Sequence, residues 1–452
     1  MNTAPRLPRP EVTHRSDWRF PLPTVTTLAN GLEVWVFHLP GQHVVAMDLL
    51  QPINLDQEPA ALEGVATLTL RASDEGTHDH PQGRITELLE NAGAAYGGRV
   101  THSVTASTLD VPVTRFGTAL PLFAEIIQHP ALAAEDVERH RGLRLAEIDQ
   151  TLASGAGTAV WALRRVLWQQ GSRSSRPSAG LRDTVSAISA GDVADFHRQH
   201  WGPQGSTLIV AGDFPADPMP SIEAAFGQWR HGAADRVQPQ VLFTDTPPSG
   251  RRVHLVHRPD AVQIDLRLAG VAVDRTDPRW APLQVATVAV GGSFLSRLNK
   301  VIREERGYTY GIHLSASPLR HLGTWTVNAS IRTEVAAAAL DETLRLLDVA
   351  DQPLTEAETA DALTQLVGIA PLHYDTAEAV VGQASVLAAA GMDADQVNRH
   401  HAALAQVTPE SATQAYTSLV GPDRGHIIIV GNADELTAPL TSAGYEISHL
   451  DM

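Results

Sequence analysis

The sequence contains the same pattern twice, and this repeat constrains the fold more than any other feature. The stretch GLEVWVFHLPGQHVVAMDLL starts at Gly31 and matches GRRVHLVHRPDAVQIDLRLA, which starts 219 residues later at Gly250. A second pair closes each half at the same offset: WGPQGSTLIVAGDF, with Pro203, and VGPDRGHIIIVGNAD, with Pro422. These landmarks indicate the duplication of one unit of about 200 residues.

Each unit has the pattern of an α+β fold. It opens with two runs rich in Val and other strand-forming residues, and it closes with a third apolar run. Long Ala- and Leu-rich stretches between them, such as 84–93 and 334–350, have helical spacing. We therefore predict two homologous units, each a mixed sheet covered by helices. They span 1–228 and 251–452, and residues 229–250, where Pro, Gly and polar residues cluster, form the linker.

Composition excludes several kinds of site. Cysteine is absent, which excludes disulfides and Cys-ligated metal. The net charge of −17 argues against a nucleic-acid partner. An acidic surface attracts basic peptides, although surplus carboxylates also serve solubility alone. No stretch has the apolar length of a membrane span, and residues 1–20 carry prolines and charges where a secretory signal needs an apolar core. We expect a cytoplasmic protein without a membrane partner.

Residues 63–77, EGVATLTLRASDEGT, have the frame of a known zinc-binding helix. Together with the opening TTLANGLEV and the duplication, they resemble the insulinase (pitrilysin) family of zinc peptidases over nearly the whole chain. The members nearest in size are bacterial and mitochondrial processing-peptidase subunits, and the resemblance implies mainly antiparallel sheets. In the family motif H-x-x-E-H, two histidines one helical turn apart hold zinc and the Glu activates a water.

The zinc ligands are missing at the aligned positions. The two histidine positions hold Thr67 and Arg71, and the general-base position holds Leu70. The family's third ligand, a Glu, falls on Glu147 and is retained. A guanidinium about 4 Å from a divalent ion repels it by roughly 8 kcal/mol at an effective dielectric of 20. We predict no metal site in this chain and an Arg71–Glu147 pair in the vacated space. The alternative is that Glu147 is an ordinary helix-surface carboxylate.

The remaining candidate histidines are not expected to bind a metal. Two of them, His38 and His257, recur in both units at strand positions and are more typical of packing or turn residues. Four others lie close together in pairs without a Glu at metal-binding spacing: His78, His80, His400 and His401.

The second unit contains VGGSFLSRLNKVIREERGYTYGIHLSASP, residues 290–318. Ser293 is predicted to cap a helix that Gly307 ends. The apolar face of this helix is expected to consist of Phe294, Leu298, Val301 and Ile302. A strand follows, in which one face is expected to hold Tyr308, Tyr310 and Ile312.

The same segment resembles the part of the insulinase family that supplies an Arg and a Tyr, seven residues apart, to the active site. Arg303 and Tyr310 keep that spacing, and they are expected to approach each other. A phenolic O–H donates to a developing oxyanion, and Arg offers a fork of donors. The resemblance further implies substrate contacts from Gly291, Gly292 and Tyr308. Without it, the Arg and Tyr are ordinary surface residues.

In two-chain members of the family, one subunit carries the zinc helix and the partner's second unit supplies the Arg and Tyr. The resemblance therefore implies a zinc-motif-lacking subunit of a heterodimeric metallopeptidase. This chain needs no cofactor, and zinc is expected in a homologous partner with an intact H-x-x-E-H. The alternatives are a non-catalytic structural or peptide-binding subunit and a homodimeric binding protein.

Peptide binding in the family uses an edge strand, to which residues 93–112 correspond. Gly97 and Gly98 stand there where the family tends to have Asn-Ala. This departure argues against peptide binding by the first unit.

Overall fold

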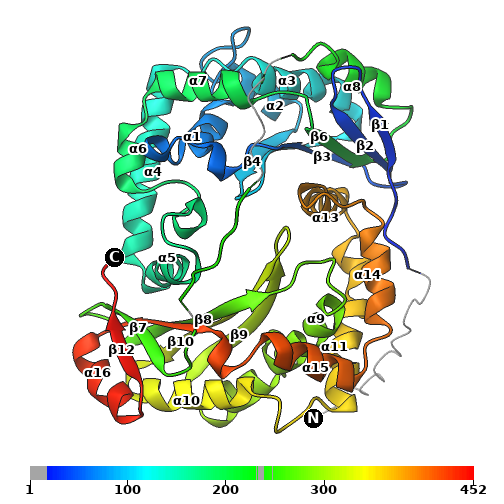
Figure 1. Ribbon diagram of the computed structural model, residues 1–452. Coiled ribbons are helices and arrows are strands. Elements are labelled where there is room, and N and C mark those ends of the chain that lie inside the picture. Colours follow the sequence, from blue (N-terminus) through cyan, green and yellow to red (C-terminus); the bar gives the residue numbers. More distant parts are fainter. Residues whose placement is uncertain (1–17, 231, 233–238, 247) are drawn as a thin grey trace, which may run out of the picture.

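The computed structural model describes residues 18–230, 232, 239–246 and 248–452 (Figure 1). The argument against a secretory signal rests mainly on residues 1–17, which lie outside the described residues. The two units lie one above the other in Figure 1, and each is a sheet with helices packed on it. None of the described helices combines the length and apolar character needed to cross a bilayer.

The first unit contains a six-stranded sheet in the order β1-β2-β6-β3-β5-β4. Its strands, in that order, are Thr24–Thr27, Glu33–His38, Thr207–Gly212, Val44–Gln51, Thr105–Pro112 and Ala95–Val100. Only β2 and β6 pair in parallel, and the other neighbours are antiparallel. The open edge that faces the centre of the molecule in Figure 1 is β4.

The second unit repeats this design in the order β12-β7-β11-β8-β10-β9. Its strands, in that order, are Glu446–His449, Arg252–His257, His426–Gly431, Gln263–Ala272, Gly323–Arg332 and Thr309–Pro318. The pairs β12-β7 and β7-β11 are parallel and the rest antiparallel. The predicted fold class, two homologous units with mixed and mainly antiparallel sheets, is therefore confirmed.

The described part of the first unit contains eight α-helices, and one of them, Arg84–Asn91, lies within the predicted stretch 84–93. They are α1 (Val65–Ala72), α2 (Arg84–Asn91), α3 (Phe116–Gln128), α4 (Ala134–Ala153), α5 (Gly155–Leu167), α6 (Arg182–Ala187), α7 (Ala190–His200) and α8 (Met219–Phe226). Single 3₁₀ turns lie at Leu55–Gln57, Ala60–Leu62, Val113–Arg115 and Arg173–Ser175.

The helices of the second unit begin with α9 (Trp280–Thr287), which continues into a π-helical turn, η5 (Val288–Gly292). A second π-helical segment, η6, spans Asn299–Glu305. The others are α10 (Ala336–Leu347), α11 (Glu356–Gly368), α12 (Ala370–His373), α13 (Ala377–Ala389), α14 (Gln396–Leu404), α15 (Pro409–Leu419) and α16 (Ala433–Ser442). Single 3₁₀ turns lie at Thr333–Val335 and Pro422–Arg424.

Strand alternation directs each sheet's side chains to two different cores. On β3, Val45, Met47 and Leu49 are buried against the helices of their own unit. The intervening Ala46 and Leu50 point to the opposite face, where they meet α13 of the second unit. Side chains at alternate positions face opposite sides, so both faces of this sheet are covered.

The two units are joined by a reciprocal exchange of helices. α13 of the second unit packs on β3 and β6 of the first sheet, and α5 of the first unit packs on β8 and β11 of the second. A Cβ at Gly155, the first residue of α5, would meet the carboxylate of Asp265 on β8, so a larger residue here would have to displace that side chain. Across the other crossing, Ser385 Oγ donates to Asp48 Oδ2 at 2.6 Å. The exchange makes one packed body of the two units.

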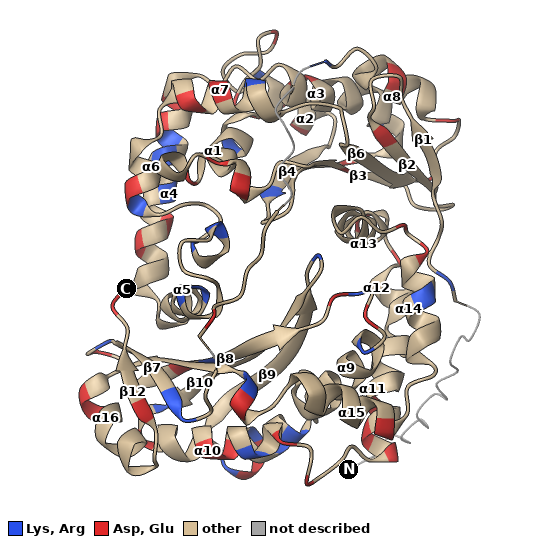
Figure 2. Ribbon diagram, in the orientation of Figure 1, with Lys and Arg blue, Asp and Glu red and all other residues tan. Residues whose placement is uncertain are grey.

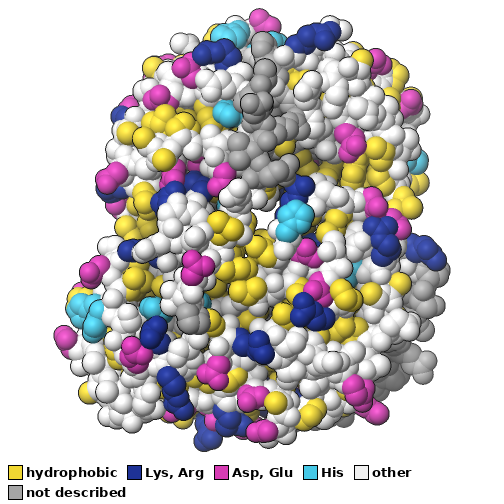
Figure 3. Space-filling model, in the orientation of Figure 1, with side chains coloured by type: hydrophobic (Ala, Val, Ile, Leu, Met, Phe, Trp, Pro, Cys, Tyr) yellow, Lys and Arg dark blue, Asp and Glu magenta, His cyan; other side chains and the backbone are white. Residues whose placement is uncertain are grey.

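Part of the predicted linker packs on the first unit. Trp229 is buried in the first unit's core, and Phe243 forms a β-bridge with Trp168 and stacks on its ring. Charged side chains of both signs are scattered over the molecule (Figure 2), and a hollow with apolar side chains around it lies between the two halves (Figure 3). The unit boundaries at 228 and 251 remain predictions.

Candidate functional site

The helix that corresponds to the zinc-binding frame, α1, is anchored at its N-terminus by a buried ion pair. Glu58 Oε1 accepts hydrogen bonds from the backbone N–H groups of Gly64 and Ala66, at 3.0 and 3.1 Å. Arg173 donates to Glu58 Oε2 at 2.8 Å, and both side chains are nearly inaccessible. Burial raises the pKa of Glu58, and Arg173 opposes that rise. Glu58 thus caps a helix whose first turn has no side-chain cap of its own.

At the other end of α1, Arg71 lies against Glu147 of α4. Arg71 Nη1 donates to Glu147 Oε1 at 2.8 Å, and Arg144 Nη1 donates to the other oxygen at 3.1 Å. Burial raises the pKa of Glu147, but the hydrogen bonds from the two arginines outweigh it and hold that pKa below its usual range. The predicted Arg71–Glu147 pair is therefore formed, on a carboxylate that remains partly exposed at the surface of α4.

These residues do not fit a zinc ion. The motif positions offer a hydroxyl from Thr67, an alkyl chain from Leu70 and a cation from Arg71, and the one carboxylate is already engaged by two guanidinium groups. In the described part of the chain, no group of three or more His, Asp or Glu side chains is placed to hold a metal ion.

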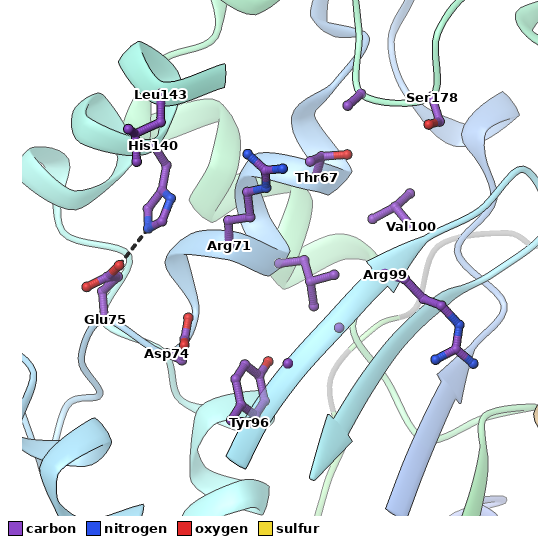
Figure 4. Close-up of a pocket in the computed structure, with 14 residues that line it drawn as sticks. Thr67, Arg71, Asp74, Glu75, Tyr96, Arg99, Val100, His140, Leu143 and Ser178 are labelled. Carbon is purple, nitrogen blue, oxygen red and sulfur yellow. Dashed lines mark hydrogen bonds and ion pairs between the residues drawn. The ribbon is translucent and has the colours of Figure 1, made fainter. Parts of the chain in front are cut away.

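A cavity of about 550 Å³ opens between α1, α4 and the edge strand β4 (Figure 4). It is lined by side chains of both charge signs and by the backbone of β4: Thr67, Leu70, Arg71, Asp74, Glu75, Tyr96, Gly97, Gly98, Arg99, Val100, His140, Leu143, Ser178 and Ala179. A Cβ on Gly98 would approach Ala106 O to 2.6 Å and Leu70 to 3.0 Å. Glycine at this position therefore lets β4 lie close to α1.

One end of the cavity is acidic. His140 Nε2 lies 2.6 Å and Arg139 Nη2 2.8 Å from the Glu75 carboxylate. Burial raises the pKa of Glu75, but these two partners outweigh it and lower that pKa overall. Burial raises the pKa of neighbouring Asp74 to about 6. Tyr96 Oη lies 3.2 Å from Ser73 Oγ, and burial raises the pKa of Tyr96 to about 12.

Sequence reasoning missed this acidic end. The His140–Glu75 contact joins residues 65 positions apart. No short motif contains both, and only the packing of α4 on α1 brings them together. The DEGT stretch after α1 was the available signal, because two consecutive acids follow the vacated ligand positions.

In the second unit, the predicted helix start at Ser293 is wrong. Helical structure from α9 runs through Gly291 and Gly292 and ends there, and Ser293 N donates back to Val288 O at 3.0 Å. The next π-helical segment spans Asn299–Glu305, and Gly307, with φ +62°, follows it as predicted. Leu298 and Ile302 are buried as expected, whereas Phe294 lies before the helix and is 65% exposed.

A β-bulge changes the predicted face of the following strand. Ala329 pairs with Ile312 but Ile331 pairs with Thr309, so the single residue between them opposes both Tyr310 and Gly311. Thr309 Oγ1 stabilises the bulge by donating to Ser330 O at 2.6 Å. Tyr310 is consequently 94% exposed while Ile312 is buried, and the expectation that they share a face is wrong.

Arg303 is predicted to approach Tyr310, but it packs on Phe294. Its guanidinium stacks on the Phe294 ring, 3.9 Å from the centroid, and Nη2 lies 2.9 Å from Glu304 Oε1. In the described part of the chain, no hydrogen bond or ion pair joins Arg303 to Tyr310. Two of the other residues that the resemblance assigned to substrate contacts are not free at the surface. Gly291 is buried against Leu314, and Tyr308 packs against the second core.

Four of the candidate histidines lie beside polar groups. His257 Nδ1 accepts from the first N–H of α16, and His400 Nε2 lies 2.6 Å from Gln284 Oε1. His80 Nδ1 lies 3.0 Å from both oxygens of Glu125 and is not simply solvated. His38 is exposed and lies 4.0 Å from Asp213.

Two profiles of one protein family match the chain. The profile of insulinase (peptidase family M16) matches residues 55–169, and the profile of the peptidase M16 inactive domain matches residues 187–366. The chain belongs to the insulinase family. Residues of α1 lie in the first matched region, and Arg303 and Tyr310 lie in the second.

The related proteins match this chain over different shares of their length. An uncharacterized zinc protease of Streptomyces coelicolor is 25% identical over 404 residues, which cover 88% of this insulinase-family chain and 87% of that protein. Subunit 1 of the mitochondrial cytochrome b-c1 complex of Mus musculus is 24% identical over 248 residues, 54% of this chain and 48% of that one. A crystal structure of a peptidase M16 inactive domain from Pseudomonas fluorescens has a TM-score of 0.80 at 22% identity, covering 91% of this chain and 98% of the other. This last likeness shows the fold.

Proposed function

We propose that this insulinase-family chain is the zinc-motif-lacking subunit of a two-chain metallopeptidase that cleaves peptides, such as leader peptides, in the cytoplasm. The partner is a homologous subunit with an intact H-x-x-E-H, which holds the zinc. This chain contributes Arg303 and Tyr310 to the partner's site. The observation that carries the proposal is the Arg71–Glu147 ion pair, which occupies the ligand position of α1.

The exposure of Tyr310 in the second unit supports the proposal. Tyr310 lies at the start of the edge strand β9 and is 94% exposed, so its hydroxyl has no competing core partner. A phenolic O–H donates a hydrogen bond to the oxyanion that forms when water attacks a peptide carbonyl. The Arg303 guanidinium, held on Phe294, offers further donors to a substrate carbonyl.

Reconstitution with the partner tests the proposal. The isolated chain is expected to leave a quenched peptide intact, and the two chains together are expected to cleave it. Tyr310→Phe should lower kcat of the pair by about 10²–10³-fold, the usual effect of removing one oxyanion donor, and Arg303→Ala should lower kcat/KM. The matched control is Arg306→Ala, which removes an exposed arginine one helical turn away.

Two results would overturn the proposal. Unchanged cleavage by the Tyr310→Phe and Arg303→Ala pairs would remove the shared site. Chelator-sensitive hydrolysis by this chain alone would show that catalysis does not require a zinc-binding partner.

A structural or peptide-binding subunit without a catalytic role is the second candidate. It is favoured by the engagement of Arg303 with Phe294 and Glu304 rather than with Tyr310. The similarity to a subunit of the mitochondrial cytochrome b-c1 complex supports the same reading. In that case the pair assembles and binds peptide normally when both residues are replaced.

A further inference from the structure

A second cavity, of about 570 Å³, lies between the C-terminal half of α4 and the helix α5. Residues between 170 and 183, together with Met452, complete its walls. Figure 1 shows the C-terminal end of the chain beside these two helices. The cavity shares no lining residue with the one beside α1. Its volume is within the range of about 300–1,000 Å³ that is typical of small-molecule sites.

Half of the twelve side chains that line this cavity are apolar: Ile148, Leu152, Trp161, Pro177, Leu181 and Met452. Ile148 is buried and Leu152 is 37% exposed, so the apolar lining extends from the core to the surface. Apolar atoms that face an open cavity lack the packing partners that a filled core provides. A ligand with an apolar body would supply those contacts.

The charged groups that line the cavity are mostly cationic: three arginines and one carboxylate, Asp183. Arg176 Nε donates to the two carboxylate oxygens of Glu63, at 3.0 and 2.7 Å. Arg182 is paired with Asp149, and the neighbouring Asp183 also attracts its guanidinium. Two of the three guanidinium groups are therefore compensated by carboxylates.

Among the described residues, no carboxylate forms an ion pair with the third arginine, Arg165, near the C-terminus of α5. Its Nη1 donates to the backbone carbonyl of Asp451 and lies 3.9 Å from Met452 Sδ. Its Nε and Nη2 have no hydrogen-bond partner in the described part of the chain. A carbonyl oxygen does not neutralise a guanidinium, so the exposed Arg165 retains a full positive charge and unused donors beside the apolar lining.

We propose that this cavity, the Arg165 pocket, binds a medium-chain fatty acid. The carboxylate accepts hydrogen bonds from Nε and Nη2 of Arg165, since one edge of a guanidinium matches the two oxygens of a carboxylate. The acyl chain lies against Trp161 and Leu152 in the apolar part of the cavity. The inference goes beyond the proposed function, because it requires neither Arg303 and Tyr310 nor a partner chain.

Calorimetric titration of the isolated full-length chain at pH 7.5 tests the proposal. The probes are decanoate, butyrate and decyltrimethylammonium, each kept below its critical micelle concentration. Butyrate has the carboxylate without the long chain, and decyltrimethylammonium has the chain with the opposite charge. Decanoate is expected to bind at least about 10-fold more tightly than either of the others.

Two variants separate the two parts of the pocket. Arg165→Gln should weaken decanoate binding about 10-fold, through loss of the charge-assisted hydrogen bonds. Leu152→Trp places a larger side chain in the cavity from a partly exposed position and should weaken binding by at least about as much. The matched control is Arg198→Gln, which replaces an exposed arginine of α7 outside the cavity and should leave affinity unchanged. Thermal unfolding of each variant confirms that the fold is retained.

Three results would overturn the inference. The first is absence of decanoate binding, and the second is equal affinity for decanoate and decyltrimethylammonium, which would indicate apolar adsorption alone. The third is undiminished affinity in either Arg165→Gln or Leu152→Trp. Activity of the reconstituted pair is independent of all three, so failure of this inference and failure of the proposed function are distinguishable.

Discussion

The two units use the same helix in different ways. In the first unit, α1 borders a cavity lined by charged groups, and its C-terminal turn carries the Arg71–Glu147 pair. In the second unit, the helix in that place is α9 with η5, whose sequence from Leu283 to Gly292 contains no charged or metal-ligating side chain. Its Ala286, Ala289 and Val290 are buried in the second core. α1 thus keeps the frame of a metal site without its ligands, whereas α9 with η5 only packs in the second core.

The helices are also anchored differently. Glu58 and Arg173 form a buried pair beneath the N-terminus of α1. The residue that corresponds to Glu58 is Asp277, which pairs with Arg279 at the surface, at 2.7 Å. Seven of the eight residues of α1 are themselves buried, so the ion pair adds a directional anchor to the packing of this helix.

Restoring the metal ligands is the largest test of this comparison. The triple variant Thr67→His, Leu70→Glu and Arg71→His recreates H-x-x-E-H on α1, opposite the retained Glu147 of α4. It is expected to bind one zinc per chain with nanomolar affinity, about 12 kcal/mol, measured by calorimetry and metal analysis. A variant with Thr67→His and Leu70→Glu that keeps Arg71 should bind none. Zinc binding by that double variant would contradict the view that Arg71 excludes the ion.

Breaking the anchor of α1, the Glu58–Arg173 pair, is expected to have the second-largest effect. Glu58→Ala removes the carboxylate closest to the buried Arg173 and leaves that guanidinium with Glu63 at 3.8 Å and with backbone carbonyls, so the free energy of unfolding should fall by about 3 kcal/mol. In the second unit, Arg279→Ala breaks the corresponding surface pair and should cost less than about 1 kcal/mol. Chemical denaturation of both variants measures the difference. Equal losses would mean that the two helices are anchored alike.

The smallest expected effect concerns the helix exchange. Burial, with the charges of Glu378 and Asp48, raises the pKa of Asp110 to about 6 beneath α13. Because the folded pKa lies above the unfolded value, this group favours the folded state at low pH. That advantage is lost as pH rises from about 4 to 6. Asp110→Asn should therefore raise stability at pH 7.5, by at most about 1 kcal/mol for this half-buried group, and less at pH 4.5.

The contact between α5 and the second sheet provides the control for this pH effect. Asp265, under α5, accepts a hydrogen bond from Ser330 Oγ at 2.7 Å. Asp265→Asn should give no gain at pH 7.5, because this carboxylate already accepts a hydrogen bond from Ser330. If denaturation experiments show the same gain in unfolding free energy for Asp110→Asn and Asp265→Asn, burial of Asp110 has no specific role.

The sequence predicted much of this protein because its signals are local or periodic. The offset of 219 residues identified the two units, and β-branched runs identified the strands that open and close them. The motif positions Thr67, Leu70 and Arg71 excluded zinc by side-chain chemistry alone. The Arg71–Glu147 pair followed because a vacated metal site leaves its carboxylate beside the new cation.

Tertiary structure decided what depends on contacts distant in the chain. A bulge between β9 and β10 turned Tyr310 to solvent, and continuation of α9 through Gly292 left Phe294 outside the helix as a platform for Arg303. The exchange of α5 and α13 and the contact of His140 with Glu75 arise likewise from packing between separate segments. Register, burial and charge pairing are properties of neighbours in space, and a sequence read along one dimension does not contain them.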